Sequence, residues 1–157
     1  MNSTKGFTLV ELLITIAVLT ILSVIAAPAM MDAYIMQNLN KSTSDLVGKI
    51  QYAQSKAMLE RKPITLTVDS STESGGKSKI TWSPTGSASV VAKTSNEIYF
   101  GPAGYPQISI DKDDFAGNQT IVVCNQAIDE ATYSRVVKVN RLGIVVEGGI
   151  IGGCSAN

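Results

Sequence analysis

The sequence of 157 residues predicts an α+β fold in which one long N-terminal helix packs on an antiparallel β-sheet head. An apolar segment and then a helical pattern occupy about the first sixty residues, and short alternating segments separated by turn residues follow. Strands that follow a single helix are typical of this fold class. With the N-terminal segment set aside, enough chain remains for one modest core.

The segment from Phe7 to Ala29 is almost entirely apolar, and Glu11 is its one charged residue. As a helix this segment would be about 35 Å long, enough to cross a bilayer. An ionised carboxylate inside such a helix costs about 2.5–3.5 kcal/mol. We therefore expect a cationic group to pair with the Glu11 carboxylate. The other polar residues of the segment are Thr8, Thr15, Thr20 and Ser23.

Helical patterning continues beyond Pro28. Proline cannot donate to the carbonyl of Val24, so we expect the helix to bend there. A helix should stop before Pro63, because the residue preceding proline avoids the α region. Apolar or small residues at spacings of three or four predict one buried stripe between these prolines. The stripe comprises Leu39, Thr43, Leu46, Ile50, Ala53 and Ala57.

After Pro63 the apolar period changes to two, which is typical of half-buried strands. The final pair of strands should form a hairpin across Asn140–Gly143. The tail from Gly148 to Gly153 contains too much glycine to hold a conformation by itself. Predicted strands cover 64–68, 79–82, 89–93, 97–100, 107–110, 120–124, 134–139 and 143–146.

Composition excludes several function classes. The net charge is zero, which argues against a general nucleic-acid binder. Histidine is absent, and no metal-ligand cluster or phosphate loop is recognisable, so we expect no enzyme, no metal and no cofactor. The acidic run Asp111–Asp114 lacks the spacing of a calcium loop and predicts a solvated turn. Two cysteines, Cys124 and Cys154, indicate one disulfide in an oxidising compartment, with two buried free thiols as the alternative.

The run from Gly6 to Leu12 closely resembles the class III leader and N-terminal motif of type IV pilins and pseudopilins. The resemblance implies that a prepilin peptidase cleaves after Gly6 and that the new N-terminal residue, Phe7, is methylated. Glu11 and Pro28 stand at the spacings of the family's glutamate and helix proline. Within this family, residues 46–57 followed by 63–66 resemble the GspH/FimT class.

This resemblance implies a minor pilin that takes part in type IV pilus assembly, in a priming or tip complex. The expected division is a leader at 1–6, a transmembrane or filament-core helix at 7–29, an amphipathic helix at 30–61 and a β head with a C-terminal disulfide loop at 62–157. Glu11 would pair with the N-terminal amine of a neighbouring subunit. The alternative is that the amine of the same chain pairs with it, which would leave a simple membrane anchor.

The implied partners are other minor and major pilins, the prepilin peptidase and, before assembly, the bacterial inner membrane. The chain would cross that membrane once with its head in the periplasm and then enter a filament at the cell surface. A minor pseudopilin of a type II secretion system is an alternative within the same family.

A third alternative is a DNA-uptake receptor pilin, with DNA as a partner. The candidate phosphate-binding residues are Arg135, Lys138 and Arg141, because strand alternation could put Arg135 and Arg141 on one face. Family members that bind DNA carry a Gly-Arg-x-Arg pattern near the C-terminus, whereas Asn140–Gly143 here contains one arginine. A solvated strand face is the competing interpretation of these three residues.

Overall fold

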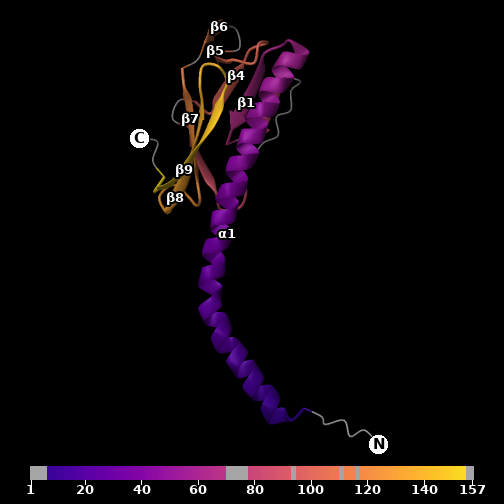
Figure 1. Ribbon diagram of the computed structural model, residues 1–157, viewed down its shortest axis with the longest axis vertical. Helices are drawn as coiled ribbons and strands as arrows, with labels where there is room; N and C mark the ends of the chain where they lie inside the picture. Colours follow the sequence, from indigo (N-terminus) through magenta and orange to yellow (C-terminus); the bar gives the residue numbers. More distant parts are fainter. Residues whose placement is uncertain (1–6, 70–77, 93–94, 110–111, 116, 155–157) are drawn as a thin grey trace, which may run out of the picture. The chain divides into compact units, whose positions relative to one another are not determined.

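The computed structural model describes residues 7–69, 78–92, 95–109, 112–115 and 117–154, and it divides into two compact units (Figure 1). The first unit is Met1–Tyr34 and the second, the head, is Ile35–Asn157. The sequence-based division began the amphipathic helix of the head at residue 30. The compact unit begins five residues later, where side chains first become partly buried.

One helix, α1, spans Leu9–Glu60. It begins two residues later than predicted because Thr8 caps it: the Thr8 hydroxyl oxygen accepts a hydrogen bond from the backbone N–H of Glu11 at 3.2 Å. The helix continues through Pro28 without a break. It ends where Arg61 adopts a positive φ of 50°, two residues before Pro63. The predicted stop before this proline is confirmed.

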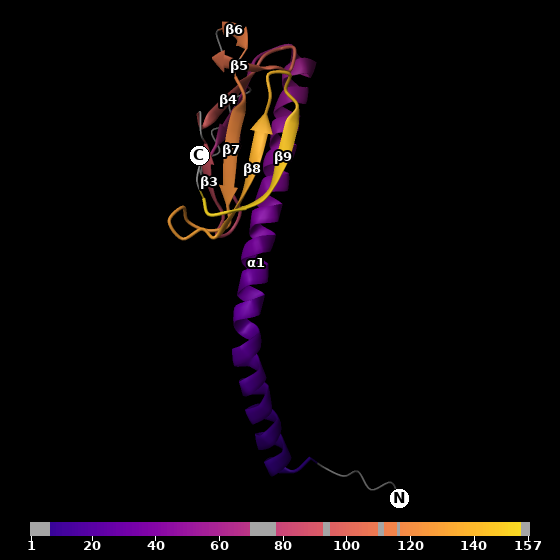
Figure 2. The ribbon, with the colours of Figure 1, turned by 60° about the vertical axis from the view of Figure 1, so that its left-hand side comes forward.

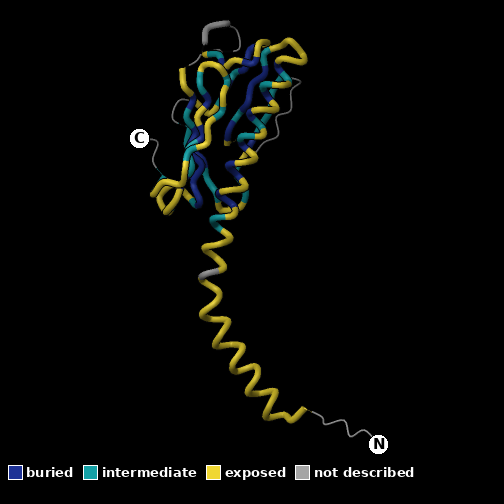
Figure 3. The backbone as a smooth tube through the Cα atoms, viewed as in Figure 1, coloured by how far each residue is buried: buried dark blue, intermediate teal, exposed yellow. Residues whose placement is uncertain are grey.

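The predicted stripe on the second half of α1 is buried in the head (Figure 3). Its apolar members pack in one core with strand residues such as Phe100 and Ile121. Thr43 is also buried, and its hydroxyl donates to the carbonyl of Leu39 at 2.8 Å, which satisfies the polar group inside the core. The helix therefore supplies one wall of the core of the head.

Two sheets form the rest of the head. The first contains β1 (Ile64–Val68), β2 (Lys79–Trp82), β4 (Glu97–Phe100), β5 (Pro106–Ser109) and β6 (Lys112–Phe115) in the order β2-β1-β4-β5-β6. The second contains β3 (Ser89–Ala92), β7 (Gln119–Cys124), β8 (Tyr133–Val139) and β9 (Val145–Gly152) in the order β3-β7-β8-β9. Figure 2 shows β7, β8 and β9 side by side.

The first sheet departs from the prediction in two respects. β2 runs parallel to β1, with Thr65 opposite Lys79, so the sheet is mixed and not purely antiparallel. β6 was not predicted, because Lys-Asp-Asp-Phe has a low strand propensity. Pairing with β5 supplies its backbone hydrogen bonds. The predicted ends at Lys93 and Ile110 lie outside the described residues.

The second sheet corrects the prediction for the C-terminal tail. The last strand was expected at 143–146, followed by a glycine-rich tail held by the C-terminal disulfide, but β9 itself continues to Gly152. Residues 133–135 and 137–139 of β8 pair with it, and at the register shift between Arg135 and Val137 two glycines of β9, Gly148 and Gly149, lie opposite Val136. A Cβ on Gly148 would lie 3.2 Å from the carbonyl oxygen of Val136. Glycine thus allows the close approach of the two strands.

A disulfide joins Cys124 at the end of β7 to Cys154, thirty residues later in the sequence. The Ser134 hydroxyl donates to the carbonyl of Gly153 at 2.6 Å, and the N–H of Gly153 donates to the carbonyl of Thr132 at 2.9 Å. The C-terminal end of β9 is therefore held to the sheet by covalent and hydrogen bonds.

Candidate assembly site

Glu11 lies in the first turn of α1, where a negative charge interacts favourably with the helix dipole. Its backbone N–H is satisfied by the Thr8 hydroxyl. Among the described residues, however, no cation forms an ion pair with its carboxylate. The carboxylate is thus the one group of this apolar segment whose charge needs a partner from elsewhere.

The other polar side chains of the segment are satisfied within the helix. The hydroxyls of Thr15, Thr20 and Ser23 donate to the carbonyls of Leu12, Ala17 and Leu19, each at 2.8 Å. Hydroxyls bonded to their own helix do not need water, which allows them to sit in an apolar environment. This contrast singles out Glu11.

The surface around Glu11 is apolar and uncovered. Every described side chain from Phe7 to Tyr34 is exposed, including Leu12 at 57% and Ile14 at 58%. The helix contains a window of mean hydropathy 2.6, so its length and composition suit a membrane span. An apolar surface this extensive has to be covered by lipid or by other helices.

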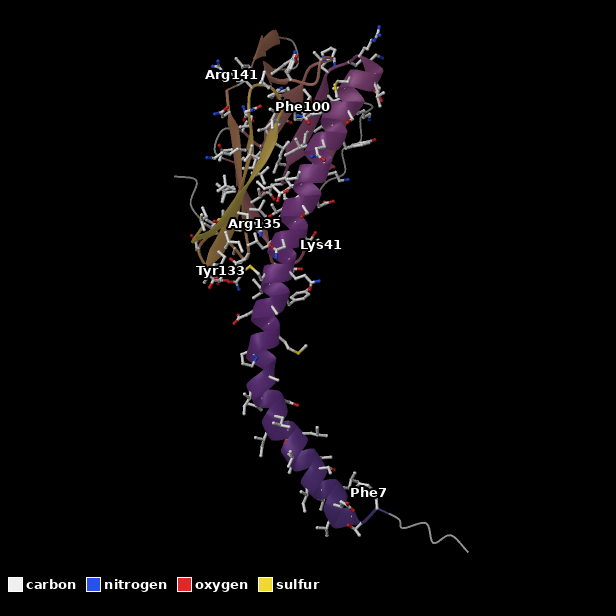
Figure 4. The ribbon with its side chains drawn as sticks, viewed as in Figure 1. Phe7, Lys41, Phe100, Tyr133, Arg135 and Arg141 are labelled. Atoms are coloured by element: carbon white, nitrogen blue, oxygen red, sulfur yellow. A yellow bond between two sulfur atoms is a disulfide. The ribbon has the colours of Figure 1, made fainter. Side chains whose placement is uncertain are left out.

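The remaining predicted residues of this segment are placed as follows. Gly6, the expected cleavage residue, lies outside the described residues. Phe7 precedes the helix and is 74% exposed (Figure 4). Pro28 lies inside α1, and the bend expected there stays a prediction.

The three candidate phosphate-binding residues do not form one surface. The interpretation that alternation places Arg135 and Arg141 on one face is wrong, because β8 ends at Val139 and Arg141 belongs to the following turn. Arg135 shares the buried face of Val137, and its Nη1 lies 3.9 Å from an oxygen of Glu147. Lys138 is exposed on the opposite face. Figure 4 shows Arg135 and Arg141 well separated in the head.

A polar network on the first sheet was not recognised from the sequence. The Tyr99 hydroxyl donates to one oxygen of Glu97 at 2.6 Å, and Lys79 donates to the other at 3.3 Å. The hydrogen bond from Tyr99, opposed by partial desolvation and assisted by Lys79, lowers the pKa of Glu97. The same hydrogen bond raises the pKa of Tyr99. Polar residues at alternate positions of 65–67, 79–81 and 97–99 were the signal that could have revealed this face.

Glu97 and Tyr99 also border an open depression of about 290 Å³. Its other lining residues include Gln107 and Gln119. The described residues contain no group of three or more histidine, cysteine or acidic side chains that could hold a metal ion. The acidic run from Asp111 to Asp114 begins outside the described residues, and the structure describes no side chain of the run.

Comparison with known proteins agrees with this geometry. Residues 1–27 match the prokaryotic N-terminal methylation motif, and residues 42–143 match the family described as type II transport protein GspH. The type IV major alpha-pilin of Moraxella bovis is 33% identical over 118 residues, which are 75% of this chain and 65% of that pilin. This chain therefore spans a little less than two thirds of the length of that relative.

Among solved structures, the type IV minor pilin FimU of Pseudomonas aeruginosa matches with a TM-score of 0.50 at 16% identity. The match covers 76% of this chain and 97% of FimU, and it shows a shared fold. The family match extends over well over half of the sequence, and the methylation motif precedes it. The chain belongs to the GspH family of type IV pilin-like proteins.

Proposed function

We propose that this chain is a minor pilin that takes part in type IV pilus assembly, in a priming or tip complex. The observation that carries the proposal is that the Glu11 carboxylate forms no ion pair with a cation among the described residues. The hydroxyls of Thr15, Thr20 and Ser23, in contrast, donate hydrogen bonds to carbonyls of their own helix. The methylation motif over residues 1–27 and the similarity to a major alpha-pilin support the same assignment. It is a structural role, with no catalytic step.

Processing would create the missing cation. Cleavage after Gly6 by a prepilin peptidase frees the α-amine of Phe7, a group that Glu11 of a neighbouring subunit can bind. Leaving the carboxylate unpaired in lipid is costly. An amine at the same axial position as the carboxylate offsets that cost. The charge pair therefore favours one axial register of the incoming helix.

The proposed division follows from this mechanism. Residues 1–6 are a leader, 7–29 the membrane and filament-core helix, 30–61 the amphipathic helix and 62–157 the β head. Before assembly the chain crosses the inner membrane once with its head in the periplasm, and its partners are other minor and major pilins. The exposed apolar surface of residues 7–34 then exchanges lipid for neighbouring helices.

The test is Glu11→Ala in cells that assemble the filament. We expect incorporation into sheared filaments to fall by about tenfold or more, since the variant loses a charge pair in a low-dielectric environment. Leader removal and methylation, measured by mass spectrometry of the N-terminal peptide, should continue. Thr20→Val is the matched control, because Thr20 bonds only to its own helix. Incorporation of Glu11→Ala at the level of this control would refute the pairing mechanism.

A type II secretion pseudopilin is the second candidate, and the family description "type II transport protein" favours it. Both candidates use the same Glu11 chemistry, so the Glu11 experiment does not separate them. Co-purification of the detergent-solubilised chain separates them, because a minor pilin should recover pilus subunits. Recovery of secretion pseudopilins alone would support the function of a type II secretion pseudopilin instead.

A DNA-uptake role is a third candidate with less support. Arg135 lies beside Glu147, and Arg141 is in a separate turn, so these two described arginines do not form a row for successive phosphates. Salt-sensitive retardation of DNA by the full chain, lost in Arg135→Ala/Arg141→Ala, would promote it.

A further inference from the structure

The end of the head at which α1 terminates carries a cluster of exposed apolar side chains that the proposed helix bundling does not use. Leu59 is 85% exposed and Leu142 is 67% exposed. We name this cluster the apolar end patch, and it comprises Met58, Leu59, Tyr105, Leu142 and Ile144.

Three segments that are distant in the sequence meet beneath this patch. Gln54 of α1 donates to the carbonyl of Gly143 in the β8–β9 turn. A Cβ on Gly143 would lie 2.9 Å from the carbonyl oxygen of Gly104, in the β4–β5 loop. A Cβ on Gly104 would in turn lie 3.0 Å from the sulfur of Met58. The three segments that carry the patch therefore pack against one another.

Exposed cations border the patch. Arg61 and Lys62 follow Leu59 after one intervening residue, Glu60, and Arg141 directly precedes Leu142. Glu60 also lies at this end, and its carboxylate is 4.0 Å from the ammonium group of Lys56 on the same helix. The described rim is positive.

The opposite end of the head carries complementary chemistry. The loop between β7 and β8 contains Ile128, which is 51% exposed, followed by Asp129 and Glu130, both exposed. We name residues 126–131 the acidic loop. Ser87 and Ser89 donate to the carbonyls of Asn125 and Gln126, and Ser42 of α1 accepts from the N–H of Thr85. These bonds place the acidic loop near Ser42, which lies twelve residues before Gln54 on α1. Figure 2 shows the β7–β8 connection and the β8–β9 turn at opposite ends of the second sheet.

We propose that the apolar end patch of one copy binds the acidic loop of a second copy, head to tail. Ile128 supplies the apolar contact, and Asp129 and Glu130 face the rim of Arg61, Lys62 and Arg141. Contiguous exposed apolar surface with a polar border is typical of interaction sites, and opposite charges fix the register of such contacts. Different surfaces of the two copies meet in this contact, so a twofold axis does not relate the copies. The inference deepens the proposed assembly function and rests on it.

The experiment uses the full chain in cells that assemble the filament, with benzoylphenylalanine in place of Leu142. We expect illumination to yield an adduct of two copies, and mass spectrometry to map the acceptor to residues 126–131. Asp129→Lys/Glu130→Lys should lower the yield by about tenfold, because like charges then face each other. Adding Arg61→Glu/Lys62→Glu should restore it.

Lys49→Glu is the matched charge-reversal control, because Lys49 lies on α1 midway between the two ends of the head. It should leave the yield unchanged. Formation of the Cys124–Cys154 disulfide, measured by thiol labelling, checks that each variant folds. An adduct with another protein, an acceptor elsewhere on the head, or no adduct would overturn the inference. Incorporation into filaments is scored separately in the same cells, so normal incorporation without the adduct rejects this contact and leaves the assembly function standing.

Discussion

The two units of this chain solve the burial of apolar residues in opposite ways. In the first unit every described side chain from residue 7 to residue 34 is exposed, whereas in the head Leu39, Leu46 and Phe100 have no exposed area. The same helix passes through both. The more apolar half of the helix is the exposed half, so the apolar content of a helix does not by itself decide its burial. The head covers its stripe with its own strands, and the first unit has to be covered by lipid or other subunits.

The difference in burial between the two units can be tested most directly with a matched pair of leucine truncations on α1. Leu46→Ala should destabilise the head by about 2–5 kcal/mol, because it leaves a cavity in a packed core. Leu22→Ala removes a side chain that is 57% exposed and should leave the stability of the head unchanged. Urea unfolding of the detergent-solubilised chain, followed by the fluorescence of Trp82, measures both. Equal effects would contradict the separation into two units.

The disulfide offers the next largest effect. Cys124→Ser/Cys154→Ser should cost about 3–4 kcal/mol, since the bond closes a loop of thirty residues. The loss should appear in the unfolding of the head and should spare the helicity of the first unit, measured by circular dichroism in detergent. A loss of helicity in the first unit as well would show that the two units unfold together.

Tight packing within the head is tested by two glycines. Gly143 has a φ of 78° and faces the carbonyl oxygen of Gly104, so Gly143→Ala should cost about 1–3 kcal/mol. Gly149 has open space at its Cβ position, and Gly149→Ala should be neutral or slightly stabilising. The same Trp82 unfolding assay compares them. If alanine were tolerated at both positions, the β8–β9 turn would have to move away from Gly104 at little cost in stability, which would contradict tight packing there.

The smallest effect is expected on the polar face of the first sheet. The pKa of Glu97 is lowered in the folded head, so its contribution is present above the pKa of unfolded glutamate and is lost as the pH falls through the folded value. The group is about one third exposed, which limits the contribution to less than about 1 kcal/mol.

Tyr99→Phe removes the largest cause of this shift and should flatten the pH dependence of unfolding on the acidic side. The raised pKa of Tyr99 has the opposite sign, because its contribution is lost as the pH rises through the folded value. An unchanged acid profile in Tyr99→Phe would show that Lys79 carries the shift instead.

Much of the fold could be predicted from the sequence because its signals are local. The spacing of Leu46, Ile50, Ala53 and Ala57 identified the buried face of α1, since helix geometry alone puts these residues in line. The motif from Gly6 to Leu12 identified the family for the same reason, because leader recognition depends on adjacent residues.

The errors arose where distant segments decide the outcome. β6 and the second half of β9 have weak strand signals of their own, and their partners β5 and β8 supply the missing hydrogen bonds. No local pattern tells that β2 pairs in parallel with β1. The separation of Arg135 from Arg141 likewise depended on where β8 ends.

The contact of Gln54 with Gly143, and of Gly143 with Gly104, also has a consequence for engineering. Two loops and a helix share one small space there, so an insertion in either loop would have to displace the other. The loops 101–105 and 140–143 are therefore poor places for an epitope tag or a fluorophore-binding sequence. A label attached to the side chain of Tyr52, which is 56% exposed on α1, would report on the head without lengthening any connection.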